Sequence, residues 1–124
     1  MEIGMMGSIL LVAAGGAAGA ILRFLVGHYV DSDQFPWATF AVNIIGSFLL
    51  ALIAFGYPGI SHEMKLLVFT GLFGAFTTMS TFTLETVTMF CDGRIGSAVL
   101  NFIANAGLCI AGAAAGRYAG LLLA

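Results

Sequence analysis

Long apolar stretches alternate with short polar connections along the whole chain. Each stretch has the ~20 residues that a helix needs to cross the hydrocarbon core of a bilayer. The stretches cover residues 8–30, 37–57, 62–91 and 95–123. The connections are rich in turn residues, namely Asp31, Ser32, Asp33 and Pro36, then Pro58, Gly59 and Ser61, then Asp92 and Gly93. The pattern predicts an all-α membrane protein, with one transmembrane domain of four helices over residues 1–124.

The composition favours the same class of protein. Of the 124 residues, 60% are hydrophobic and 8% are charged, whereas soluble domains have about 25% charged residues. The N-terminus carries Glu2 and lacks the cationic start of a signal peptide, so we expect the first stretch to remain as a helix in contact with lipid. The formal net charge of -2 gives no reason to expect a nucleic-acid partner. Cys91 and Cys109 lack metal-ligand spacing, and we expect two small buried thiols.

The third stretch contains a polar segment that a simple membrane crossing does not need. Between Gly71 and Glu85 the chain reads GLFGAFTTMSTFTLE, and five of the seven residues from Thr77 to Thr83 carry hydroxyls. Irregular backbone and clustered hydroxyls occur at membrane depth where they line a pore or a bound ion. We therefore predict two half-helices, separated by an irregular break within residues 74–78.

The second half-helix can form a polar track. Thr78, Thr81 and Glu85 fall on one helical face, and Ser80 lies on its flank. Phe82 lies on an adjacent face, and an aromatic ring has a positive edge that could hold a small dehydrated anion. Ordinary packing is the alternative for Phe82, since the chain has 11 phenylalanines.

Other polar residues within the predicted helices each have two interpretations. Arg23 could extend to the membrane surface or supply a positive charge at an aqueous vestibule. Asn43 could bond to a neighbouring helix, or its amide N–H could face an anion. Glu85 could lie near water or carry a proton. Asn101 and Asn105, four residues apart on one face, could line a polar path or join two helices.

The basic residues give almost no orientation signal. With four spans both termini lie on one side, together with Lys65 and Arg117, whereas Arg94 and Arg23 lie toward the other side. Orientation follows the Lys/Arg bias between the two sides, so the chain could insert both ways and form an antiparallel homodimer, or insert one way despite a weak bias. Glycines at GxxxG spacing predict close helix packing within or between subunits; they are Gly15 and Gly19, and Gly112, Gly116 and Gly120.

Three segments, in the same order and at similar spacing, resemble motifs of the Fluc/CrcB family of fluoride channels. GLFGAFTTMSTFTLET resembles the family signature GFLGGxTTFSTFSxET, and WATFAVNIIGSF resembles WGTLxVNxxGxF in the second helix. GAAGAILRF resembles the GxxxGxxxR element of the first helix. The matches extend over essentially the whole chain, and their combination is highly specific.

The resemblance implies an antiparallel, dual-topology homodimer with two fluoride pores in a bacterial inner membrane. It also implies a structural sodium ion at the dimer centre, held by the backbone carbonyls of Gly74 and Thr77. By motif position, Arg23, Asn43, Ser80, Thr81 and Phe82 match residues of the fluoride pathway. The predicted pathway consists of these five residues and three more. The three are Glu85, and Met79 and Asn101 at two further pathway positions.

The sequence departs from the family pattern at several positions. Met79 stands where the signature has its first phenylalanine, and a thioether has no positive ring edge. Asn101 stands where we expect an aromatic residue, and Ala38 and Ala75 replace glycines. A pore with one ring edge could bind fluoride more weakly, or a different partner subunit could supply the second ring.

We therefore expect a fluoride-specific channel that exports fluoride passively and is not an enzyme, because no catalytic set of residues is present. One alternative is a small dual-topology drug/proton antiporter, which needs an acid early in the chain, where this sequence has Arg23. The other is a membrane scaffold without transport activity, which leaves the hydroxyl-rich break unexplained.

Overall fold

The computed structural model describes residues 3–30 and 33–124, and all the regular secondary structure in these residues is helical. Four helical stretches are long and apolar enough to cross a membrane. They are Met5–Tyr29, Trp37–Gly56, His62–Cys91 and Ile95–Leu123. The expected all-α membrane architecture is confirmed. Glu2, Asp31 and Ser32 lie outside the described residues.

The first two spans are uninterrupted helices, whereas the last two change their geometry along their length. The first two are α1 (Met5–Tyr29) and α2 (Trp37–Gly56). The third consists of α3 (His62–Lys65), η1 (Leu66–Phe73), α4 (Gly74–Phe76) and α5 (Met79–Cys91). The fourth consists of α6 (Ile95–Ile103), η2 (Ala104–Leu108) and α7 (Cys109–Leu123). The segments η1 and η2 are π-helical, a geometry that is frequent at functional sites.

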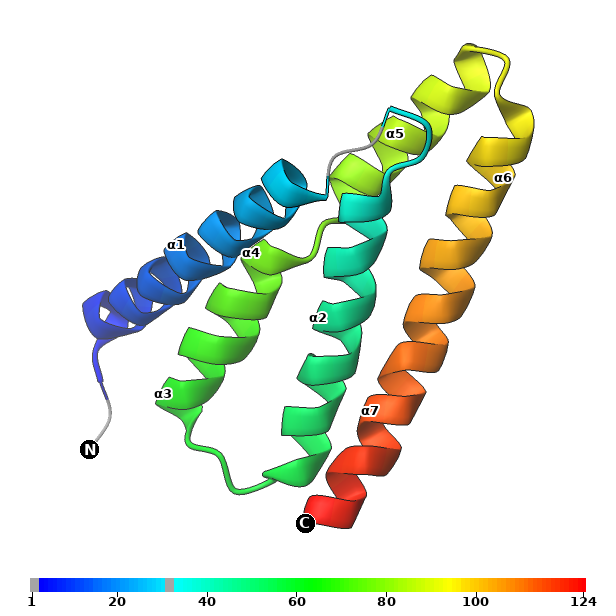
Figure 1. Ribbon diagram of the computed structural model, residues 1–124. Helices are drawn as coiled ribbons and strands as arrows, with labels where there is room; N and C mark the ends of the chain where they lie inside the picture. Colours follow the sequence, from blue (N-terminus) through cyan, green and yellow to red (C-terminus); the bar gives the residue numbers. More distant parts are fainter. Residues whose placement is uncertain (1–2, 31–32) are drawn as a thin grey trace.

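The helices pack mainly in pairs. The helix α1 lies against η1 and α4, α2 lies against α7, and α5 lies against α6 (Figure 1). The start of α1, the end of α7 and the connection between α2 and α3 lie at one end of the bundle (Figure 1). The end of α1, the start of α2 and the connection between α5 and α6 lie at the opposite end (Figure 1). This is the arrangement expected for an even number of spans.

Two of these pairs depend on glycine for their close approach. A Cβ atom at Gly19 would lie 2.1 Å from the carbonyl oxygen of Leu72, and one at Gly116 would lie 2.2 Å from that of Phe48. Larger residues would therefore push α1 away from the third span and α7 away from α2. The GxxxG glycines thus pack helices within one subunit, where lipid provides no hydrophobic drive for helix association.

The third helix breaks at Thr77 and Thr78, which have extended backbone angles. The break lies within the predicted window, but Gly74 itself is helical. At the restart, the Thr78 hydroxyl accepts a hydrogen bond from the Thr81 N–H, so Thr78 caps α5. Gly46 on α2 makes room for the Thr77 methyl group, which would lie 2.3 Å from a Cβ at that position.

The two cysteines are free and differ in their surroundings. Cys109 is partly buried, whereas Cys91 is exposed at the end of α5. The expectation of two buried thiols is therefore wrong for Cys91, because the last turn of α5 buries Met89 and leaves Cys91 exposed.

Candidate functional site

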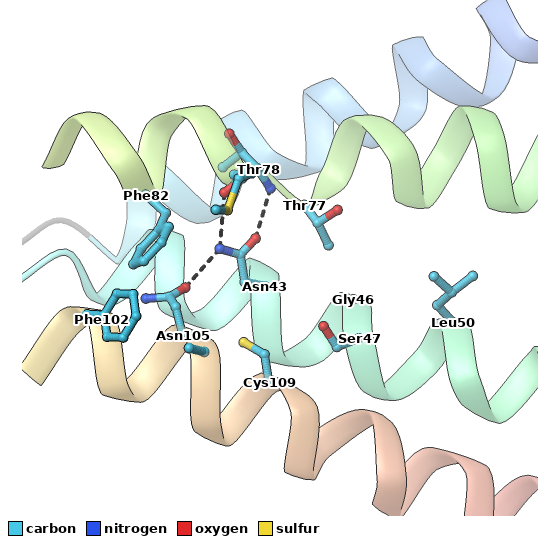
Figure 2. Close-up of a pocket in the computed structure, with 12 residues that line it drawn as sticks. Asn43, Gly46, Ser47, Leu50, Thr77, Thr78, Phe82, Phe102, Asn105 and Cys109 are labelled. Carbon is cyan, nitrogen blue, oxygen red and sulfur yellow. Dashed lines mark hydrogen bonds between the residues drawn. The ribbon is translucent and has the colours of Figure 1, made fainter. Parts of the chain in front are cut away.

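The side chain of Asn43 pairs with the backbone at the helix break. Its Oδ1 atom accepts the Thr78 N–H at 2.8 Å, and its Nδ2 atom donates to the Thr78 carbonyl oxygen at 3.1 Å (Figure 2). In a continuous helix the Thr78 N–H would donate to the carbonyl of Gly74. Asn43 therefore satisfies the Thr78 N–H, which the break would leave unpaired in a membrane, where such a group costs several kcal/mol.

Asn43 is the first member of a hydrogen-bonded chain, the asparagine network, which consists of Asn43, Asn105, Asn101 and Thr86. Asn43 Nδ2 donates to Asn105 Oδ1 at 2.9 Å, and Asn105 Nδ2 donates to Asn101 Oδ1 at 3.0 Å. Asn101 Nδ2 donates to the Thr86 hydroxyl at 2.9 Å. That hydroxyl donates to the carbonyl of Phe82 at 2.7 Å. The network thus joins the break to α2, η2, α6 and α5.

The direction of every bond in the asparagine network follows from the Thr78 backbone. The Thr78 N–H can only donate and the Thr78 carbonyl can only accept, which fixes the orientation of the Asn43 amide. The orientation of Asn43 then fixes that of Asn105, and Asn105 fixes that of Asn101. Asn101 is completely buried, with 0% of its surface exposed, and Asn105 is 8% exposed. The sequence predicted Asn101 as a residue of the fluoride pathway, and in the structure its buried side chain bonds to Thr86 on α5. The i, i+4 spacing to Asn105 was the signal for this network, although Asn105 was not among the predicted pathway residues.

A pocket of about 330 Å³ lies beside the break, between α2, α5 and the fourth span (Figure 2). We call it the break pocket. Its lining includes three predicted pathway residues and the ring of one residue that the sequence interpretation missed. The three are Asn43, Met79 and Phe82, and the missed residue is Phe102. Amide groups and aromatic rings therefore share one surface at membrane depth.

A smaller pocket of about 150 Å³ lies on the other side of Thr78 and is lined by Arg23, Thr39 and Thr81. We call it the arginine pocket. Arg23 is half-buried, and its Nε donates to the Ala75 carbonyl at 3.0 Å. The Thr78 hydroxyl donates to Thr81 at 3.0 Å. Arg23 thus supplies a positive charge at the break, one helical turn before α5 begins.

Glu85 and Ser80 occupy other positions on α5. Glu85 accepts a hydrogen bond of 2.5 Å from the Thr39 hydroxyl and lines a third pocket of about 270 Å³, together with Arg94. Ser80 is exposed, with its hydroxyl 3.4 Å from that of Thr78. Nothing in the sequence signalled Thr39 as the partner of Glu85. Within one subunit the predicted pathway residues therefore lie on several faces around the break.

The carbonyls of Gly74 and Thr77 have lost their usual helical donors. The Thr78 N–H donates to Asn43, and the Thr81 N–H, which would otherwise reach the carbonyl of Thr77, donates to the Thr78 hydroxyl. The nearby carbonyl of Ala75 is taken by Arg23. Hard cations prefer such oxygen ligands, so Gly74 and Thr77 fit a sodium site in donor chemistry.

Comparisons with known proteins point to one family. The family model described as CrcB-like protein, Camphor Resistance (CrcB), matches residues 10–117. A relative named fluoride-specific ion channel FluC, from Sulfurovum sp. (strain NBC37-1), is 43% identical over 106 residues, which cover 82% of this chain and 84% of the relative. Relatives of the same name from Geobacter sulfurreducens and Agrobacterium fabrum are 43% and 41% identical, over 117 and 115 residues. These two alignments cover 90% and 88% of this chain, and 94% and 92% of the relatives.

Proposed function

Because the chain belongs to the CrcB family, we propose that this multi-pass bacterial membrane protein is a fluoride-specific ion channel that lets fluoride leave the cytoplasm passively. The observation that carries the proposal is the break at Thr77 and Thr78, with Asn43 bonded to its backbone and a pocket on each side. A broken helix at membrane depth is tolerated where it is buried in protein or lines an aqueous path. A scaffold without transport activity has no need of this arrangement.

The working unit in this proposal is an antiparallel homodimer. The four basic residues are divided evenly between the two halves of the bundle. Lys65 in α3 and Arg117 in α7 lie toward one end, and Arg94 before α6 and Arg23 in α1 lie toward the other. An even distribution leaves orientation unspecified. The break pocket and the arginine pocket are both open at the subunit surface, so a second copy can complete the wall of each path.

A structural sodium ion at the centre of the dimer is part of the same proposal. The carbonyls of Gly74 and Thr77, freed from their helical donors by Asn43 and Thr78, would hold it. Sodium would supply positive charge and tie the two broken helices together. Replacing sodium by a larger cation tests the sodium site, and we expect lower dimer stability and lower fluoride flux. Unchanged dimer stability and flux would remove Gly74 and Thr77 as ligands.

The driving force in this mechanism is the membrane potential. Hydrogen fluoride is a weak acid that enters cells and ionises at neutral pH, which traps fluoride inside. A potential that is negative inside contributes about 2.3 kcal/mol per charge for each 100 mV, and each 1.4 kcal/mol is about tenfold in concentration. A passive channel can therefore deplete fluoride well over tenfold without a coupled ion.

The residues of this chain would have distinct roles along the path. Arg23, held at the Ala75 carbonyl, makes the arginine pocket attractive to an anion. The hydroxyls of Ser80 and Thr81 can exchange hydrogen bonds with an ion that has lost water. The ring of Phe82 lines the break pocket and presents a positive edge rather than a full charge, which allows the ion to leave again.

Anion efflux from liposomes tests this function. Liposomes that contain the purified protein and fluoride, with a potassium ionophore to balance charge, should release fluoride and retain chloride. Equal release of both ions, or of neither, would sink the proposal. Phe82→Ile should abolish or sharply slow the release. Phe90→Ile is the matched control and should not, because Phe90 is an exposed phenylalanine of α5 that does not line the break pocket.

A further inference from the structure

Two phenylalanine rings lie side by side at the break pocket. The centroids of Phe82 on α5 and Phe102 on α6 are 6.5 Å apart, and their planes are tilted by 31° (Figure 2). Both rings line the break pocket. Phe82 is 7% exposed and Phe102 is 58% exposed, so Phe82 forms the deep part of this aromatic wall and Phe102 the open part.

Three polar side chains that line the pocket already donate to protein acceptors. Both Nδ2 hydrogens of Asn43 have acceptors, at Thr78 and at Asn105. Asn105 donates to the side chain and the carbonyl of Asn101. The hydroxyl of Thr77 donates to the Phe73 carbonyl.

An anion that takes a hydrogen bond from one of these three side chains therefore displaces a protein acceptor. Displacing an acceptor is costly, because a buried polar group that loses its partner costs about 1–3 kcal/mol. The edge of an aromatic ring carries partial positive charge and needs no such exchange.

Met79 is another large apolar side chain of the pocket and cannot provide such an edge. It is 73% exposed and stands at the first position of α5. Its thioether is polarizable, but it has no ring with a positive edge. Two ring edges are therefore available from one subunit at this pocket, one from α5 and one from α6.

We propose that Phe102 is a second ion-contacting residue of the channel, whose ring edge, next to that of Phe82, holds a small dehydrated anion in the break pocket. The identity of that anion as fluoride rests on the proposed function. Phe102 in this way supplies, from the fourth span, the ring that Met79 does not supply from the third.

Substitution of Phe102 tests the proposal by fluoride efflux from liposomes. Phe102→Leu should slow fluoride release about tenfold, which corresponds to about 1.4 kcal/mol in the barrier, whereas Phe102→Tyr, which keeps the ring, should retain most of the rate. Phe90→Leu is the control and should release fluoride at the original rate. If Phe102→Leu is not recovered as a folded protein, Phe102→Met serves in its place with the same expectation.

A rescue experiment distinguishes ion contact from packing. Adding Met79→Phe to Phe102→Leu restores a ring to the pocket from a different helix, and should restore much of the fluoride flux. Two outcomes would overturn the role of Phe102: failure of this rescue, or full fluoride flux in Phe102→Leu while flux in Phe82→Leu is slow. Neither outcome would contradict the proposed function as a fluoride channel. If the unsubstituted protein releases no fluoride, the proposed function itself fails, which is a separate outcome.

Discussion

The bond between Asn101 and Thr86 provides a direct energetic test of the asparagine network. Asn101 Nδ2 donates to the Thr86 hydroxyl at 2.9 Å across the interface between α6 and α5. Asn101 is fully buried and Thr86 is partly buried, so water has little access to the Asn101 amide. Asn101→Leu and Thr86→Val remove the two sides of this bond with little change in volume.

The expected size of the effect follows from the partners that each variant leaves behind. Thr86→Val leaves a buried amide N–H of Asn101 without an acceptor, which costs about 1–3 kcal/mol. Asn101→Leu removes that donor, so Asn101→Leu should cost less stability when it is added to Thr86→Val than when it is made in the original protein. Side-chain hydrogen bonds within membrane proteins average about 0.6 kcal/mol and reach about 1.7 kcal/mol in such cycles. Because the Asn101 side of this pair is fully buried, we expect a coupling energy of about 1–1.5 kcal/mol.

The assay is reversible unfolding of the purified protein in mixed micelles, with the single and double variants measured together. A parallel cycle between Asn101→Leu and Thr88→Val is the control. Thr88 is an exposed hydroxyl of the same helix that donates to its own Leu84 carbonyl. Its coupling to Asn101 should fall within the ~0.3–0.5 kcal/mol seen for independent sites. A coupling that small for Asn101 and Thr86 as well would refute the network.

Three further predictions follow from contacts around the break. Gly19→Ala should lower the free energy of unfolding by about 1–3 kcal/mol, because the new Cβ would meet the Leu72 carbonyl at 2.1 Å. Gly16 has open space around it, so the control Gly16→Ala should be neutral or slightly stabilising. Equal effects of the two substitutions would contradict the close packing of α1. Thr39→Val should cost about 1–2 kcal/mol through loss of the hydrogen bond to Glu85, and Thr39→Ser should not; the same unfolding assay compares them. Exchanging sodium for a larger cation should weaken the dimer in analytical ultracentrifugation, and an unchanged dimer would argue against a central sodium ion.

The four spans and the existence of a break could be predicted from the sequence because lipid leaves few alternatives. A backbone without water must bond to itself, so long apolar stretches become helices, and all four appear as helices in the structure. The exact place of the break could not be predicted in the same way. Gly74 seemed the natural helix breaker, but the backbone leaves the helix at Thr77, where the side chain of Asn43 accepts the N–H of the next residue.

The partners in the site depend on packing between distant segments. The spacing of Asn101 and Asn105 showed that they share a face, but not that this face meets Asn43 and Thr86. Phe102 gave no signal at all, since an exposed aromatic residue in an apolar helix is usually interpreted as facing lipid. The role proposed for it rests on the position of the Phe82 ring beside it, which only the structure gives.

The reversal potential for fluoride tests the central claim of passive, selective conduction most directly. In a planar bilayer with the protein, a tenfold fluoride gradient with equal chloride on both sides should give a reversal potential close to about 59 mV, with no dependence on a proton gradient. A reversal potential near zero, or one that follows the proton gradient as an antiporter requires, would contradict the account.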